Sequence, residues 1–165
     1  MDSAPDPEVL GVALSRYAAV IAYLSEGIAL EVALSHAAIE ADRWSSVSAA
    51  WGTKLAESTR IDTSLVDLFD YHCEVARANV ERPLPPLDVD YRAFARFFLA
   101  FCQSASPLDF LADRGMVEND IFRLQALWQT RLAEDEELRK SAGAAWADEG
   151  GVPEVHPSPA RLRGT

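Results

Sequence analysis

The sequence has few cysteines and no long apolar run, which limits both its compartment and its contact with membranes. Two cysteines, Cys73 and Cys102, cannot form a disulfide framework, and their scarcity favours a reducing cytoplasm. Both lie in apolar helical stretches, which predicts buried free thiols. The longest apolar stretch, 94–102, is interrupted by Arg96 and falls short of the roughly 18 residues that span a bilayer. We therefore expect no membrane partner.

Positive charge is also scarce. Lysine and arginine number 15 against 26 aspartates and glutamates, which gives a formal net charge of −11. Binding to nucleic acid requires a basic face, so the composition argues against a nucleic-acid partner. The acidity permits a basic protein partner that is attracted over a long range. The plainer interpretation is that the acidity keeps the protein soluble.

Motifs that carry chemistry are missing. GxGxxG, the P-loop, HExxH, GxSxG and Glu-x-x-His all fail to occur. His36 and Glu40 share one helix face, but a metal needs a further ligand that the pattern does not supply. His72 and Cys73 are adjacent and point in different directions on a helix. A nucleophilic Cys73 would need a histidine, such as His36, brought close by the fold. We expect no catalytic, cofactor or metal site and no enzyme.

The feature that is present is a repeated helical pattern. Residues 42–57 read DRWSSVSAAWGTKLAE, and residues 119–134 read NDIFRLQALWQTRLAE. Both stretches open on an Asx residue and end in Leu-Ala-Glu. Trp51 and Trp128 occupy the same place in them, 77 residues apart. Because tryptophan is rare, the match indicates one helical unit written twice.

The match extends upstream at the same offset. The matched pairs are Leu10/Leu87, Leu14/Tyr91, Tyr17/Phe94, Val20/Phe97, Ile21/Phe98, Leu24/Phe101, Leu34/Leu111 and Ile39/Met116. After Glu57 the offset becomes 73, which pairs Asp62 with Asp135 and Leu65 with Leu138. The alternative is that any two amphipathic helices can be aligned by sliding. The run of identities around the two tryptophans favours duplication.

Helical spacing dominates, and no stretch alternates apolar and polar residues over a useful length. The predicted fold is all-α, with about eight helices as two pseudo-repeated four-helix units packed into one bundle-like domain. Each copy is small, so we expect a shared interface. The predicted organisation is a disordered N-terminus at 1–5, helical repeat 1 at 6–80, a Pro-rich hinge at 81–87, helical repeat 2 at 88–148 and a disordered tail at 149–165.

Six residues are candidates for partner binding. The four phenylalanines of the 91–101 helix cover too much of its surface to face one core. We expect part of this set to meet the first copy, and the alternative is a groove for a partner. Two cations at equivalent positions lie close to a tryptophan along the chain, although solvated ion pairs with Glu57 and Glu134 are the plainer interpretation. The candidates are Phe94, Phe97, Phe98, Phe101, Lys54 and Arg131.

Three functions remain open. The first is a non-catalytic acidic protein-interaction module, such as an adaptor, a scaffold or a secretion-type chaperone. The second is an immunity-like partner that neutralises a basic toxin or effector. The third is a small-molecule binder or enzyme with a pocket between the repeats. The repeated hydrophobic pattern favours the first and the acidity favours the second, while no pattern favours the third.

Overall fold

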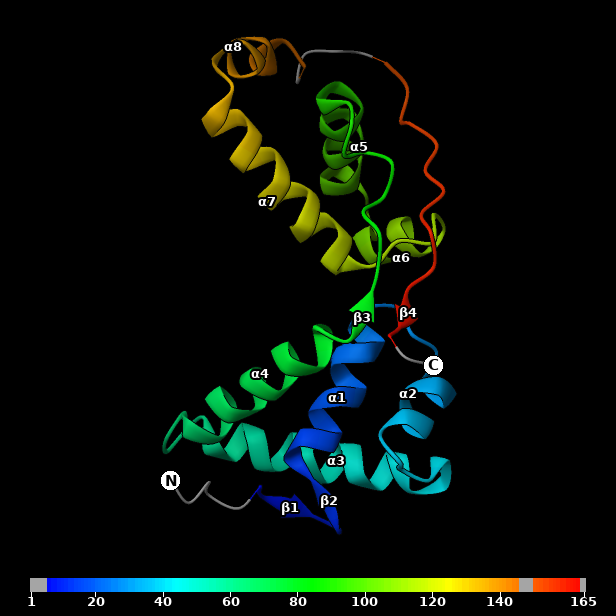
Figure 1. Ribbon diagram of the computed structural model, residues 1–165, viewed down its shortest axis with the longest axis vertical. Coiled ribbons are helices and arrows are strands. Elements are labelled where there is room, and N and C mark those ends of the chain that lie inside the picture. The colour runs from blue at the N-terminus through cyan, green and yellow to red at the C-terminus, as the bar shows by residue number, and fades with distance from the viewer. Residues whose placement is uncertain (1–5, 146–149, 164–165) are drawn as a thin grey trace. The chain divides into compact units, whose positions relative to one another are not determined.

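The structure, a computed structural model, describes residues 6–145 and 150–163 (Figure 1). Within these ranges it has eight α-helices and four strands of two residues each. The prediction of an all-α fold with about eight helices is therefore confirmed. The N-terminal residues 1–5, predicted to be disordered, lie outside the described residues.

The chain folds as two compact units, each with its own hydrophobic core. Unit 1 contains residues 1–81 and 160–165, and unit 2 contains residues 82–159. The first boundary falls inside the segment 81–87 that the sequence marks as a hinge. Buried hydrophobic side chains form one cluster in each unit, in place of the single core expected of one bundle-like domain.

Unit 1 combines four helices with two short strand pairs. Its elements are β1 (Glu8–Val9), β2 (Val12–Ala13), α1 (Leu14–Ser25), α2 (Leu30–His36), α3 (Ala41–Ser58), α4 (Ser64–Arg77), β3 (Val80–Glu81) and β4 (Arg161–Leu162). β1 pairs with β2, and β3 pairs with β4, both antiparallel.

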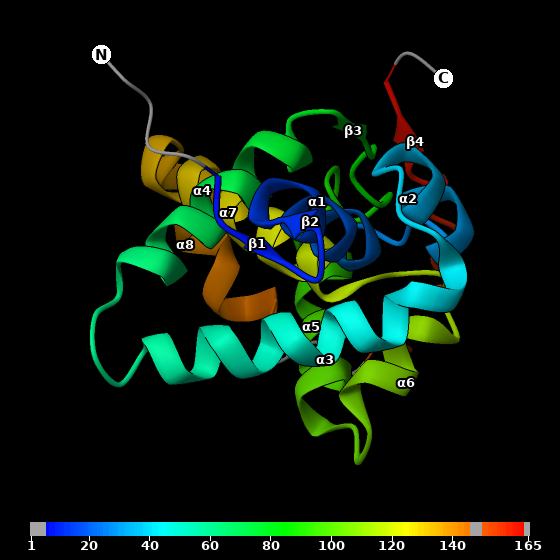
Figure 2. The same ribbon diagram turned by 90° about the horizontal axis from the view of Figure 1, so that it is seen from below.

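The hairpin β1–β2 occupies the first residues of the segment 6–80, which the sequence predicts to be helical (Figure 2). Leu10 and Gly11 form its two-residue turn with positive φ values of 51° and 71°, the backbone that a tight hairpin requires. Asp6 still acts at a helix start, because its carboxylate accepts a hydrogen bond from the Ser15 backbone N–H at 3.4 Å. The prediction was therefore wrong on where α1 begins, which is Leu14.

The core of unit 1 is built around Trp51, which is fully buried. Its indole N–H donates to the Val12 carbonyl at 3.2 Å, so the polar edge of the ring is satisfied. The ring of Tyr17 stacks on it with centroids 5.8 Å apart. α4 packs against α1 (Figure 1), and its Phe69 ring lies 5.9 Å from that of Tyr17. The Trp-centred stripe of α3 is thus core.

Unit 2 has four helices. They are α5 (Tyr91–Gln103), α6 (Pro107–Ala112), α7 (Glu118–Glu134) and α8 (Glu136–Ala145). Its first three helices begin 77 residues after α1, α2 and α3, which is the offset found in the sequence. Asp90 caps α5 as expected and accepts a hydrogen bond from the Arg92 N–H at 2.9 Å. α7 begins one residue before Asn119, its expected cap.

The stop after the second helix of each unit has the same geometry. Ala38 and Gly115, 77 residues apart, have φ values of 51° and 65°. The Ile39 N–H donates to the Leu34 carbonyl at 2.9 Å, and the Met116 N–H donates to the Leu111 carbonyl at 3.0 Å. This left-handed stop turns the chain toward the long third helix in both units. Whether the two units are copies of one ancestor stays a prediction.

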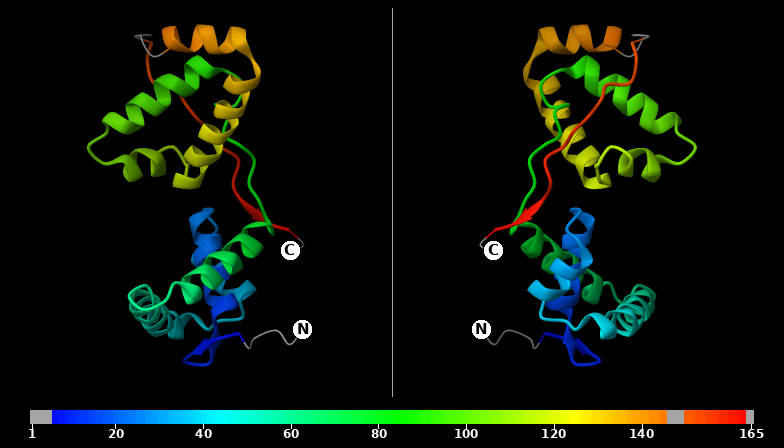
Figure 3. Two further views of the ribbon diagram at one scale, coloured as in Figure 1. Left: turned by 90° about the vertical axis from the view of Figure 1, so that its left-hand side faces the viewer. Right: turned by 90° about the vertical axis from the view of Figure 1, so that its right-hand side faces the viewer.

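The C-terminal segment, predicted to be disordered from residue 149, is ordered over its described residues 150–163. Val155 is 3% exposed in the core of unit 2, and Leu162 is 6% exposed in the core of unit 1. β4 lies against β3, and the Arg163 N–H donates to the Asn79 carbonyl at 2.8 Å (Figure 3). The prediction was wrong because an extended segment that docks through single aliphatic residues leaves no periodic pattern.

Candidate partner-binding site

An aromatic pocket of about 140 Å³ lies between α5 and α7 of unit 2. The spacing of the sequence builds it, because residues three and four apart share one face of a helix. Its walls are apolar except for two glutamine side chains. The lining residues that define the aromatic pocket are Tyr91, Phe94 and Phe98 of α5 with Gln125, Trp128, Gln129 and Leu132 of α7.

Stacked rings form the floor of this pocket. The Trp128 ring lies 6.2 Å from Phe94 at an interplanar angle of 25° and 5.3 Å from Tyr91 in an edge-on arrangement. The indole N–H of Trp128 donates to the Leu87 carbonyl at 3.0 Å. With its polar edge paired, the ring presents only apolar surface to an occupant. Leu87 is 1% exposed, so this end of the Pro-rich segment is fixed in unit 2.

The four candidate phenylalanines face the core of their own unit. Phe94 and Phe97 are 4% and 0% exposed, and Phe98 and Phe101 pack partly buried against the same core. The expectation that this set is too broad for one core was wrong, because the rings stack on one another along the helix. Phe94 and Phe98 line the aromatic pocket, while Phe97 packs beside Phe110 at 5.2 Å.

The two candidate cations lie over the two buried tryptophans. Lys54 Nζ is 5.1 Å from the Trp51 ring centroid, and the Arg131 guanidinium carbon is 4.9 Å from that of Trp128. Arg131 also donates to the Asp88 carbonyl, which ties the end of α7 to the start of α5. A cation–π contact contributes about 0.5–1 kcal/mol at a partly exposed site. The sequence predicts each cation close to its tryptophan, although ion pairs with Glu57 and Glu134 were the plainer interpretation.

Several carboxylates lie close along the chain to residues that line the aromatic pocket. Asp88 and Asp90 directly precede the lining residue Tyr91, and Glu134 and Asp135 closely follow the lining residue Leu132. The glutamates Glu136 and Glu137 come next and share Lys140, at 3.1 and 2.9 Å. Hydrogen bonds to these two carboxylates raise the pKa of Lys140. The segments next to the start of α5 and the end of α7 thus carry more carboxylates than cations, although Arg131 lies over the Trp128 ring there.

No protein-family model, curated protein or solved structure matches this chain. The function therefore has to be argued from the geometry of the sites themselves.

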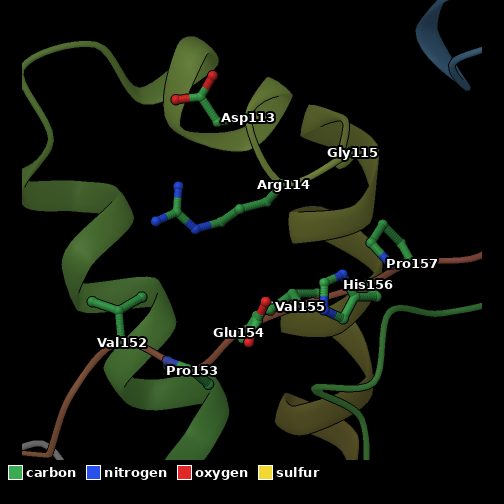
Figure 4. A pocket seen from close by; sticks show the side chains of 9 residues that line it. All are labelled: Asp113, Arg114, Gly115, Val152, Pro153, Glu154, Val155, His156 and Pro157. Atoms are coloured by element: carbon green, nitrogen blue, oxygen red, sulfur yellow. Dashed lines mark ion pairs between the residues drawn. The ribbon is translucent and has the colours of Figure 1, made fainter.

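A cavity of about 710 Å³ is an open surface cleft in unit 2 (Figure 4). The end of α6 and the turn after it form one wall, and the extended segment 152–157 forms the other. Its Glu154 and His156 side chains form an ion pair at 3.2 Å, but both are more than four-fifths exposed. Groups so freely solvated are not held in a fixed geometry, which positioned chemistry requires. This cleft therefore carries no functional argument.

A third hollow, of about 410 Å³, lies in unit 1 beside His36. The Tyr23 hydroxyl lies 3.3 Å from His36 Nδ1, and burial raises the pKa of Tyr23. Glu31 shares this hollow with His36. Among the described residues, no group of three or more His, Cys, Asp or Glu is placed to hold a metal ion.

The two cysteines have opposite environments. Cys73 is 2% exposed and donates through Sγ to the Ala18 carbonyl at 3.6 Å. Burial raises the pKa of its thiol to about 11, which suppresses the reactive thiolate. Cys102 is exposed, so the prediction that both thiols are buried was wrong for this residue.

One strong interaction, a buried ion pair, was not predicted from the sequence. Arg82, inside the expected hinge, makes a bidentate ion pair with Asp120 at 2.7 and 2.5 Å, and both side chains are almost fully buried. The Asp120 carboxylate also accepts from the Val117 backbone N–H at 3.0 Å. The two residues lie 38 positions apart, and neither shows a local pattern that would reveal the pairing. The segment that follows β3 is thereby anchored to α7.

No helix in the described ranges is long and apolar enough to cross a bilayer.

Proposed function

We propose that this protein is a non-catalytic protein-interaction module, in the manner of an adaptor, a scaffold or a secretion-type chaperone, and that its aromatic pocket is the docking point. The single observation that supports this function is the pocket of stacked rings between α5 and α7. Hot spots of protein interfaces are enriched in tryptophan, tyrosine and arginine, placed in pockets that exclude water. Trp128, Tyr91 and Arg131 supply these three residue types side by side.

The rim of the pocket supports a protein partner over a purely apolar ligand. Gln125 and Gln129 carry amides that both donate and accept hydrogen bonds, as a peptide backbone or polar side chain requires. An apolar centre with a polar rim is the usual anatomy of a protein interface. The two free cysteines fit a module that works in a reducing cytoplasm.

A second candidate function is an immunity-like partner that neutralises a basic toxin or effector. It is favoured by the net charge of −11 and by the carboxylates at one end of the aromatic pocket. Both functions use the same surface, and they differ in how much of the affinity comes from charge. Steep weakening of partner binding with added salt would favour the second candidate.

The proposed function is tested by capture of partners with the full chain as bait, in wild-type form and in two variants. Gln129→Arg places a long cation at the mouth of the aromatic pocket. Thr130→Arg adds the same side chain at the next exposed position, which points in another direction on α7. We expect at least one protein to be retained by the wild type and by Thr130→Arg and to be lost with Gln129→Arg. If no protein depends on Gln129 in this way, the proposed function is wrong.

A further inference from the structure

The face that forms the aromatic pocket has a counterpart in unit 1, where a helix covers it. Tyr17 stands 77 residues before Phe94, and each ring stacks on the central tryptophan of its unit. In unit 1 the fourth helix lays Phe69 over Tyr17, with ring centroids 5.9 Å apart. By the offset of 73, the counterpart of Phe69 is Ala142. Ala142 is buried in the core of unit 2 and brings only a methyl group to it.

The fourth helices also pack differently. α4 packs mainly against α1, whereas α8 packs against both α5 and α7. In unit 2, the Phe94 and Phe98 rings of α5 line a pocket. In unit 1, by contrast, Tyr17 of α1 is enclosed by α3 and α4. Unit 1 therefore provides an example of a structure that packs on such an aromatic face. It is an amphipathic helix that inserts an aromatic side chain.

The size of the aromatic pocket agrees with this occupant. Its volume of about 140 Å³ is close to that of the apolar protein cavities of about 150 Å³ that take up benzene. A space of this size accommodates one phenyl ring. The pocket is open to solvent, so the ring can be carried by another chain.

The charges around the pocket specify the rest of the occupant. The chain just before Tyr91 carries Asp88 and Asp90, and the chain just after Leu132 carries Glu134 and Asp135, so carboxylates outnumber the cation Arg131 next to this end of the pocket. A helix that seats a ring in the pocket extends past this end and is attracted there by positive charge. α4 itself, with Asp67, Asp70 and Glu74, would be repelled at the same place.

From these observations we propose that the aromatic pocket binds a basic amphipathic helix of another protein, which inserts one aromatic side chain between Phe94, Phe98 and Trp128. This inference rests on the proposed function and specifies the partner. The inserted ring takes the role that Phe69 has in unit 1. Lysine and arginine residues on the flank of the helix face the carboxylates at the start of α5 and the end of α7.

The test is selection of a displayed library of amphipathic helices by the full-length chain. The central apolar position and the flanking polar positions are randomised, and binders are counter-selected against Gln129→Trp, whose indole occludes the pocket. We expect enrichment of phenylalanine, tyrosine or tryptophan at the central position and of lysine and arginine at the flank. Replacing the central ring by alanine lowers affinity about tenfold or more.

Thr130→Trp is the matched control, because it adds the same indole at a position that does not line the pocket. Selected helices bind this variant as tightly as the wild type, and added salt weakens their binding several-fold. Failure to select any helix, absence of a preferred central ring, or equal binding to Gln129→Trp would each overturn the inference. A cellular partner that depends on Gln129 while no helix is selected leaves the proposed function standing and rejects only the helical partner. If no cellular partner depends on Gln129 and no helix is selected, both the proposed function and the helical partner are rejected.

Discussion

The fourth helix distinguishes the two units. In unit 1, α4 lies along α1 and encloses Tyr17 with the ring of Phe69. In unit 2, α8 lies against both α5 and α7 (Figure 3) and carries Ala142 at the corresponding place. The first three helices of the two units begin at a constant offset, and both central tryptophans donate to a backbone carbonyl just before the first helix of their unit.

This difference shows how one helical plan yields a closed core or a pocket. The α5 rings are stacked mainly on one another and on Trp128, so they remain partly buried without a covering ring. Stacked aromatic pairs contribute about 0.5–1.5 kcal/mol beyond the area they bury, which helps to keep the pocket formed when it is empty. Unit 1 is accordingly the structural reference for the aromatic pocket of unit 2.

The strongest test of the comparison removes the two central tryptophans in turn. Trp51→Ala and Trp128→Ala are each expected to lower the free energy of unfolding by about 3–5 kcal/mol. The loss for Trp51→Ala should be the larger of the two, because Trp51 is fully buried, whereas Trp128 already borders a pocket. Hydrogen exchange in each unit, followed with urea, measures both losses. Near-normal stability of either variant would show that its tryptophan is not a core residue.

The buried charges differ between the units and should respond differently. Asp120→Ala leaves Arg82 buried without its carboxylate partner, and we expect a loss of about 3–5 kcal/mol in unit 2. Glu26→Ala in unit 1 should cost less, because its partner Arg77 lies at 3.9 Å and keeps a second carboxylate, that of Glu74, at 2.5 Å. Glu118→Ala, at an exposed position of the same α7 turn as Asp120, is the control. Equal losses for the two buried acids would contradict this account.

Deleting the C-terminal segment should remove a buried side chain from the core of each unit. Removing the chain from Gly150 onward takes away Val155 of unit 2 and Leu162 of unit 1. Because a buried aliphatic side chain contributes about 1.5–3 kcal/mol, we expect a loss of about 3 kcal/mol or more, shared between the units. Val155→Ala should raise hydrogen exchange in unit 2, and Leu162→Ala should raise it in unit 1. An unchanged melting temperature after the deletion would restore the prediction of a disordered tail.

The smallest predicted effect concerns the two thiols. Cys102 should react with a thiol reagent in the native protein, while Cys73 should react only after unfolding. With its pKa raised to about 11, only about one thousandth of Cys73 is thiolate at pH 8. The folded state holds this proton more tightly than the unfolded state, so Cys73 makes stability fall as the pH rises from 9 to 11. Rapid labelling of two thiols per native chain would refute the buried position of Cys73.

The sequence was informative where the structure depends on local patterns. Helical spacing indicated the fold class, because it acts within a few residues of the chain. The tryptophan repeat predicted corresponding positions for Trp51 and Trp128 and a cation near each of them along the chain. The structure places each cation over the tryptophan ring.

The sequence was uninformative where the structure depends on pairings distant along the chain. The Arg82–Asp120 ion pair and the β3–β4 pairing join residues that share no local signal. The short hairpin β1–β2 was also missed, because its strands have only two residues each and the turn is Leu-Gly. Phe94 and Phe98 were named as candidates, but Gln125 and Gln129 were not, since their role depends on how α7 faces α5.

The most direct test of the central claim follows the indole N–H signals of Trp51 and Trp128 by NMR during titration with fluorobenzene. The aromatic pocket of unit 2 should take up the ring and shift the Trp128 signal, while the Trp51 signal, enclosed beneath α4 and Tyr17, should stay in place. The shift should disappear in Gln129→Trp and persist in Thr130→Trp. Equal shifts of both tryptophans, or no shift of Trp128 at saturating fluorobenzene, would contradict the claim that unit 2 keeps open the site that unit 1 has filled.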